Sequence, residues 1–144
     1  KFADSLRAGQ PIDVYNHGRM IRDFTYIDDV VEAVIRVLDK PATANPDYDP
    51  LHPDAATAAA PFRLFNIGNG QPTPLMDYIG ALERALGSSA SIKMMEMQPG
   101  DVPATSADTS ALHDWVGFAP NTKVEDGVAK FAEWYLDYFG RTLA

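Results

Sequence analysis

The spacing of apolar residues changes several times along this chain, and each change predicts the start of a new helix or strand. Helical spacing of apolar residues predicts a first helix over residues 2–8. Alternating runs at 12–15 and 22–27 flank a Gly-containing turn at 16–20, and together they predict a β-hairpin. The next helix opens on two acidic residues and ends near Asp39. Its apolar stripe is expected to lie in the core and comprises Val30, Val31, Val34, Ile35, Val37 and Leu38.

The second half of the chain also alternates between extended and helical patterns. The predicted elements are strands at 62–67 and 91–97 and helices at 74–86, 109–116 and 122–140. Thr73 is the expected N-cap of the first of these helices, which Gly87 ends. Thr122 and Glu125 form a capping box for the last helix. Its aromatic stripe is either core or a surface for a partner.

Residues 40–61 interrupt this pattern. The segment holds five prolines and an alanine-rich end, so it offers little apolar mass to bury and few positions for a helix or a sheet ladder. We expect a mobile surface loop, in which His52 is solvated rather than bound to a ligand.

Length and charge limit the possible functions. At 144 residues the chain has room for one domain, and its 46% hydrophobic content is ordinary for a globular protein. The net charge of -8 argues against nucleic acid and anionic membranes as partners. With no cysteine there is no disulfide framework or thiolate metal site, and no apolar run reaches the roughly 18 residues of a membrane helix. A cytoplasmic location is the default expectation.

Arg22 is the first candidate for chemistry, because it stands where the second alternating run begins. A planar guanidinium that is always charged suits a phosphate or a carboxylate. The alternative is a structural ion pair, with Asp23 or another carboxylate of this acidic chain.

Three motifs, in order along the chain, resemble a known family. They are Arg-Asp-Phe-Thr-Tyr-Ile-Asp-Asp-Val-Val-Glu-Ala from Arg22, Phe-Asn-Ile-Gly-Asn-Gly from Phe65, and Met-Gln-Pro-Gly-Asp-Val-Pro-Ala-Thr from Met97. The chain resembles the C-terminal substrate domain of nucleotide-sugar epimerases and dehydratases, which are extended short-chain dehydrogenases. UDP-glucuronate 4-epimerases are the most similar, and the likeness runs along most of the chain except 42–61.

The resemblance implies an α/β fold of α+β-like character, in which residues 1–144 form the nucleotide-sugar-binding C-terminal domain. The Rossmann domain that binds NAD would lie upstream and is missing from this chain, which starts at Lys1 as a fragment would. The Gly68–Gly70 turn is not the expected cofactor loop, because two following prolines remove N–H donors. The family's catalytic pair is Tyr with Lys four residues later, and no Tyr here has that Lys. The chain is therefore expected to contain no catalytic, cofactor-binding or metal-binding residue and to be inactive alone.

The resemblance also implies which residues hold the substrate. Arg22 would clamp the diphosphate, and Tyr15 would pack on the base or ribose. The backbone of Asp13 and Val14 would contact the edge of the uracil.

Two further candidates come from the third motif. Gln98 stands where many relatives have an Arg that makes a second phosphate contact, so it could bind phosphate without bringing charge. Asp101 is either an acceptor on the ribose side or a carboxylate that caps a turn.

For the intact protein the resemblance implies an NAD-dependent UDP-sugar 4-epimerase, which oxidises C4, rotates the 4-keto sugar and returns hydride to its other face. A dehydratase or decarboxylase working from the same intermediate is the enzymatic alternative. A non-catalytic nucleotide-binding module is the alternative from another class. The intact protein is expected to be a homodimer. The isolated chain should expose an apolar face that the Rossmann domain normally covers, and should self-associate through it.

Overall fold

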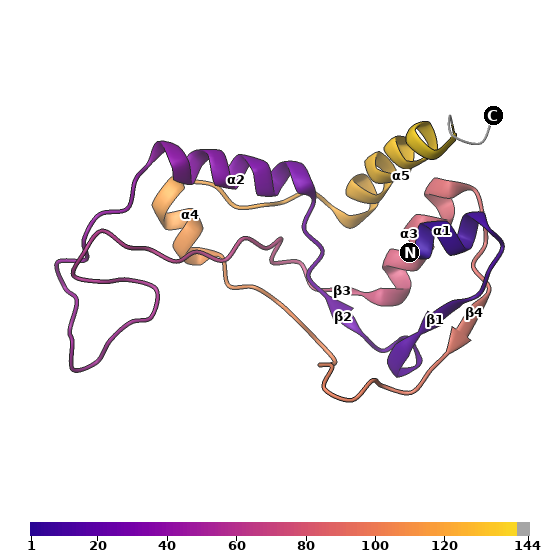
Figure 1. Ribbon diagram of the computed structural model, residues 1–144, viewed down its shortest axis with the longest axis horizontal. Helices are drawn as coiled ribbons and strands as arrows, with labels where there is room; N and C mark the ends of the chain where they lie inside the picture. Colours follow the sequence, from indigo (N-terminus) through magenta and orange to yellow (C-terminus); the bar gives the residue numbers. More distant parts are fainter. Residues whose placement is uncertain (141–144) are drawn as a thin grey trace. The chain divides into compact units, whose positions relative to one another are not determined.

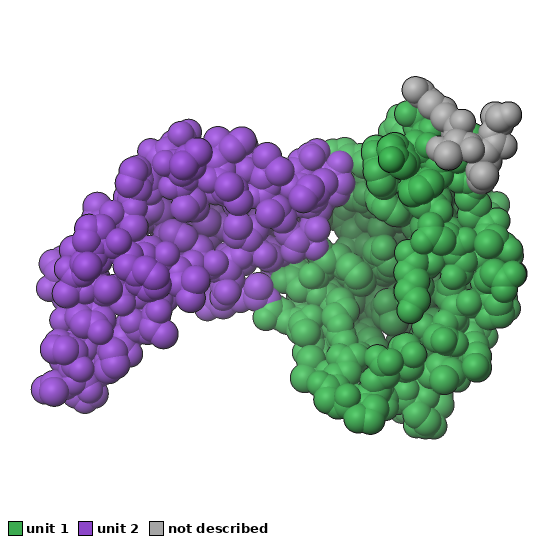
Figure 2. Space-filling model, in the orientation of Figure 1, with its two compact units in different colours: residues 1–24, 71–106, 122–144 green, residues 25–70, 107–121 purple. Residues whose placement is uncertain are grey.

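The computed structural model describes residues 1–140, so residues 141–144 of the expected domain lie outside the described residues. Contacts divide the chain into two compact units (Figure 2). Unit 1 contains residues 1–24, 71–106 and the chain from 122 on, and unit 2 contains residues 25–70 and 107–121. The single domain expected from length stays a prediction, and the contacts within the chain fall into these two units.

Unit 1 contains helices and short strands that come from three stretches of the chain. Its elements are α1 (Phe2–Arg7), β1 (Ile12–Val14), η1 (Tyr15–Gly18), β2 (Ile21–Arg22), β3 (Thr73–Pro74), α3 (Leu75–Leu86), β4 (Ile92–Met94) and α5 (Val124–Gly140) (Figure 1). β1 pairs in parallel with β4, and β2 pairs antiparallel with β3. Each sheet has two strands.

The predicted hairpin is wrong, because β1 and β2 do not pair with each other. Asn16 and His17, between the two strands, both adopt left-handed backbone angles with φ near 50° and belong to the 3-10 turn η1. This turn sends the chain to a different sheet instead of folding β2 back along β1. The partners of both strands lie more than fifty residues further along the chain, where local sequence patterns give no information about pairing.

The core of unit 1 lies where β1 meets the helices α1, α3 and α5. Ile12, Val14, Ile79 and Leu82 are each at most 2% exposed, and each such side chain contributes about 1.5–3 kcal/mol through burial. The Tyr135 hydroxyl donates to the Asp4 carboxylate at 2.6 Å and so joins α5 to α1. The rest of the α5 aromatic stripe is partly exposed, as Trp134 shows at 54%.

Unit 2 contains two helices, α2 (Ile27–Asp39) and α4 (Ser110–Val116), which pack together. Trp115 fixes the chain around them, since its Nε1 donates to the Lys40 carbonyl at 3.2 Å. The Lys40 ammonium lies 4.6 Å from the centre of the indole ring and the Arg63 guanidinium 4.4 Å from it. The indole therefore carries two cation–π contacts.

The predicted core stripe of α2 is wrong for this chain. Only Ala33 of α2 is buried, whereas Val34 is 53% exposed and Leu38 is 76% exposed. An amphipathic pattern indicates that one face of a helix is suited to burial, but it does not indicate which part of the protein covers that face. Within unit 2 the short α4 covers only a small part of that face.

Residues 40–61 contain no helix or strand, as expected, but they are folded on themselves. Carboxylates accept backbone N–H bonds two residues on, as Asp49 does from Leu51 at 2.8 Å and Asp54 from Ala56 at 2.9 Å. The mobility of this loop stays a prediction. The strand predicted at 62–67 is wrong, since among residues 1–140 its only ladder contact is an isolated bridge between Thr57 and Arg63.

The extended run predicted at 22–27 is wrong beyond Arg22, because β2 ends there and Ile27 already belongs to α2. The other elements follow the sequence pattern, with small shifts of their ends. Thr73 is not the N-cap of α3, because Thr73–Pro74 form β3 and the helix begins at Leu75. Gly87 ends α3 with φ of 64°, as predicted. β4 and α4 lie within the predicted ranges, and α5 begins at Val124 and ends at Gly140.

Candidate functional site

Two stretches of unit 1 build the candidate site, residues 12–22 and the loop 95–105. Four backbone hydrogen bonds join them: Met95 N to Val14 O at 2.9 Å, His17 N to Met95 O at 3.0 Å, Ile21 N to Pro103 O at 2.9 Å, and Thr105 N to Ile21 O at 3.2 Å. The loop therefore follows the first stretch from the end of β1 to β2. This pairing gathers all six residues that sequence reasoning selected into one part of the molecule.

β1 presents an open edge at Asp13. Ile12 N donates to Ser91 O at 2.8 Å and Val14 O accepts from Met95 N at 2.9 Å, so these two residues bond toward β4. Alternation along a strand turns the N–H and C=O of Asp13 to the opposite edge, which pairs with no described strand. The side chain of Val14 is fully buried, so Val14 belongs to the core rather than to the open edge.

Tyr15 opens the strained turn η1. Asn16 and His17 follow it in left-handed conformations, each costing about 1–3 kcal/mol for a residue other than glycine. Contacts on several sides hold the turn in place. His17 Nε2 lies 3.0 Å from Glu96 Oε1, and a Cβ on Gly18 would lie 2.9 Å from the sulfur of Met76.

Arg22 pairs with another residue selected from the sequence. Its Nη2 donates to Asp101 Oδ1 at 2.9 Å, and its Nη1 donates to the carbonyls of Ile21 at 2.8 Å and Pro103 at 3.4 Å. The two charged side chains are 25% and 34% exposed. The structural ion pair considered for Arg22 is therefore present, with Asp101 rather than Asp23.

A tight turn fixes Asp101. Asp101 N donates to Gln98 O at 3.2 Å, and Gly100 has φ of 84° after Pro99, the arrangement of a type II turn. Asp101 Oδ1 also accepts from Val102 N at 2.8 Å. Gln98 is exposed at the start of this turn.

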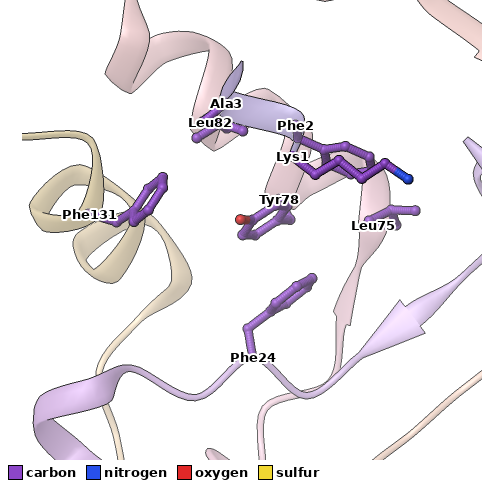
Figure 3. Close-up of a pocket in the computed structure, with 8 residues that line it drawn as sticks. All are labelled: Lys1, Phe2, Ala3, Phe24, Leu75, Tyr78, Leu82 and Phe131. Carbon is purple, nitrogen blue, oxygen red and sulfur yellow. The ribbon is translucent and has the colours of Figure 1, made fainter. Parts of the chain in front are cut away.

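An apolar pocket that sequence reasoning missed lies in the same unit (Figure 3). Its volume is about 350 Å³, and it is lined by Lys1, Phe2, Ala3, Phe24, Leu75, Tyr78, Leu82 and Phe131. The rings of Phe24 and Tyr78 stack with centroids 4.3 Å apart. Burial raises the pKa of the Tyr78 hydroxyl, so it stays a neutral donor. The residue in the sequence that could have indicated this pocket is Phe24, an aromatic residue two positions after Arg22.

The chain offers no fitting place for a dinucleotide at the turn before α3. Pro72 and Pro74 lack N–H groups, and the N–H of Leu75 at the start of the helix donates to Met20 O at 2.8 Å. These residues do not fit the pyrophosphate of NAD. In residues 1–140 no cluster of three or more possible ligands suits a metal ion. None of the helices in that range has the length and apolar character needed to cross a bilayer.

Comparison with known proteins gives concordant matches. Residues 1–49 match the NAD dependent epimerase/dehydratase family. Protein CapI from Staphylococcus aureus is 46% identical over 96% of this chain. A probable UDP-glucuronate 4-epimerase from Rhizobium meliloti (strain 1021) is 46% identical over 98% of this chain. The chain spans 42% of the length of each of these relatives.

Among solved structures, MoeE5 in complex with UDP-glucuronic acid and NAD has a similar fold. The TM-score is 0.74 at 23% identity, over 95% of this chain and 40% of that chain. At this identity the likeness concerns the fold alone.

Proposed function

Because this chain belongs to the family of NAD-dependent nucleotide-sugar epimerases and dehydratases, we propose that the intact protein is a UDP-sugar 4-epimerase acting on UDP-glucuronate or a related UDP-hexose. The likeness of fold confirms the predicted α/β class, and it covers 40% and 38% of the two similar chains. The part described here would hold the UDP moiety.

The observation that carries this proposal is the oriented guanidinium of Arg22. The carbonyl and carboxylate acceptors on Nη1 and Nη2 leave Nε without an acceptor among residues 1–140. An arginine with a free donor side is suited to a phosphate. The diphosphate would bind there, while Gln98 would donate an uncharged hydrogen bond from its exposed position.

The uridine would be held by neighbouring features of unit 1. The open edge at Asp13 offers one backbone donor and one acceptor, which complement an imide edge such as that of uracil. Tyr15, directly after β1, would pack on the base or ribose. The apolar pocket beside Phe24 would accept an aromatic or aliphatic face of the ligand.

The redox chemistry would take place outside this chain. The residues at 72–75 do not fit NAD, and no Tyr with Lys four residues on is present. An upstream Rossmann domain would bind NAD and supply that pair. It would also cover the exposed face of α2, which includes Val34 and Leu38. A cytoplasmic homodimer is part of the same proposal.

The first experiment is calorimetric titration of UDP into the intact protein and its Arg22→Ala variant. Loss of a hydrogen bond to a charged group should weaken binding by about 1.5–3 kcal/mol, or roughly 10- to 150-fold in Kd. Arg19→Ala is the matched control, because Arg19 is an exposed cation of the same region, and within the described residues its Nε donates only to Asn16 O, at 3.5 Å. An unchanged Kd for Arg22→Ala would remove Arg22 from the site.

Turnover tests the reaction itself. The intact protein, incubated with NAD and UDP-glucuronate, should form the C4 epimer, which chromatography or proton NMR distinguishes from the substrate. Formation of a dehydrated or decarboxylated sugar nucleotide would instead support the enzymatic alternative.

A further inference from the structure

The guanidinium of Arg22 is fixed on one side only. Nη1 donates to Ile21 O at 2.8 Å and to Pro103 O at 3.4 Å, and Nη2 donates to Asp101 Oδ1 at 2.9 Å. Because the group is planar, these bonds also set the direction of Nε–H and of the remaining Nη2 hydrogen. Of the three acceptors, only the Asp101 carboxylate comes from a side chain.

Asp101 is itself held in place independently of Arg22. The turn from Gln98 uses Pro99 and Gly100, whose φ of 84° suits the third position of a type II turn. The N–H of Val102 binds the same Oδ1 that accepts from Arg22, at 2.8 Å. The carboxylate is thus oriented by the backbone and can in turn orient a flexible arginine.

We propose that Asp101 is a positioning residue, which acts on the nucleotide through Arg22 and does not itself bind the ribose. This inference rests on the proposed function, since it concerns the same UDP site. Asp101 holds the guanidinium so that its unoccupied donors face the diphosphate.

The pair also sets the electrostatics of the site. At longer range the negative charge of Asp101 offsets the positive charge of Arg22, and it repels the incoming phosphates. Gln98 adds no positive charge to the site. Affinity then depends on directed hydrogen bonds rather than on net positive charge. Removing the negative charge while keeping the acceptor should therefore preserve or improve binding.

A double-mutant cycle tests the inference. UDP is titrated calorimetrically into the intact wild type, Arg22→Ala, Asp101→Ala and the double variant. We expect Asp101→Ala to weaken UDP binding about 5- to 20-fold in the wild-type background and to have no effect when Arg22 is absent. Asp101→Asn retains Oδ1 as an acceptor, so its Kd should stay within about twofold of wild type or be lower.

Each result decides between the possible roles. If Asp101→Ala lowered the affinity for UDP equally in the wild-type and Arg22→Ala backgrounds, Asp101 would contact the nucleotide directly, and the inference would be overturned. Full loss in Asp101→Asn would also overturn it, because the charge itself would then be required. If the wild type binds no UDP, the proposed function fails instead. Circular dichroism and the melting temperature of each variant show whether it is folded, and Asp101→Asn keeps the test available if Asp101→Ala unfolds.

Discussion

At the scale of single residues, the site depends on side chains that are oriented by backbone geometry. Arg22 and Asp101 were both selected from the sequence, but their pairing was not, because 79 residues separate them. The residue type identifies a phosphate-binding group, whereas its direction depends on acceptors that the chain brings from elsewhere. Phe24 and Tyr78 were missed for the same reason, since their stacking is a tertiary contact.

Gly18 gives the prediction at this scale. Its φ of 78° lies in the region that favours glycine, and a Cβ there would approach the sulfur of Met76 to 2.9 Å. We expect Gly18→Ala to lower the free energy of unfolding by about 1–2 kcal/mol and to weaken UDP binding by moving the turn that follows Tyr15.

Gly80→Ala is the matched control for Gly18→Ala. Gly80 lies inside α3 without a positive φ, and its nearest neighbour would be the end of the Arg84 side chain at 3.4 Å. Alanine there should raise stability by about 0.4–1 kcal/mol. Urea denaturation measures the free energy of unfolding of both variants. Equal changes in the two would show that the backbone of Gly18 has no particular requirement for glycine.

At the scale of elements, the sequence predicted helices better than strands. The ends of α2, α3 and α5 follow periodic apolar positions and terminal glycines or acidic residues, which are local signals. β1 lies within the extended run predicted at 12–15, but the run predicted at 22–27 shares only Arg22 with β2, and the partner of neither strand was predicted. Strands of two or three residues acquire a partner only through tertiary packing, so the hairpin was the wrong choice.

The contact between α1 and α5 carries a prediction about pH. The Tyr135 hydroxyl lowers the pKa of the Asp4 carboxyl, whose usual value is 3.8. A carboxyl with a lowered pKa in the folded state contributes stability above its usual pKa, and that contribution is lost as pH falls through the lowered value. Tyr135→Phe should therefore be less stable than wild type at pH 7, and the difference should shrink below about pH 3.8.

Chemical denaturation across that pH range measures this difference. Tyr138→Phe serves as the control, because Tyr138 lies on the exposed side of the same helix at 59% exposure. A difference between wild type and Tyr135→Phe that stays constant down to pH 2 would contradict the role given to Asp4.

At the scale of the whole molecule, the two units differ in how fully they bury their apolar residues. Unit 1 has a core built from three helices and β1. In unit 2 the α2 face is exposed at Val31, Val34, Ile35 and Leu38. The sequence predicted that an apolar face would be left exposed, but it assigned the residues of α2 to the core. Periodicity cannot distinguish a face covered within a chain from one covered by another domain.

Val34→Glu with Leu38→Lys tests whether this face drives self-association. The chain of residues 1–144 should associate at rising concentration, and the double variant should be monomeric, with helix α2 retained through a Glu–Lys pair one turn apart. Analytical ultracentrifugation measures both. Trp134→Lys, which changes an exposed aromatic residue of unit 1, should leave association unchanged. A wild-type chain that is monomeric throughout would contradict the prediction.

The indole of Trp115, which contacts two cations, has a consequence for spectroscopy. The protein has two tryptophans, and they are divided between the units, with Trp115 in unit 2 and Trp134 in unit 1. Replacing either with phenylalanine leaves a single tryptophan, and its emission, excited selectively over that of the six tyrosines, reports on one unit. Intrinsic fluorescence can thus follow each half of this chain separately, and coincident or separate melting curves would reveal whether the halves unfold as one cooperative body.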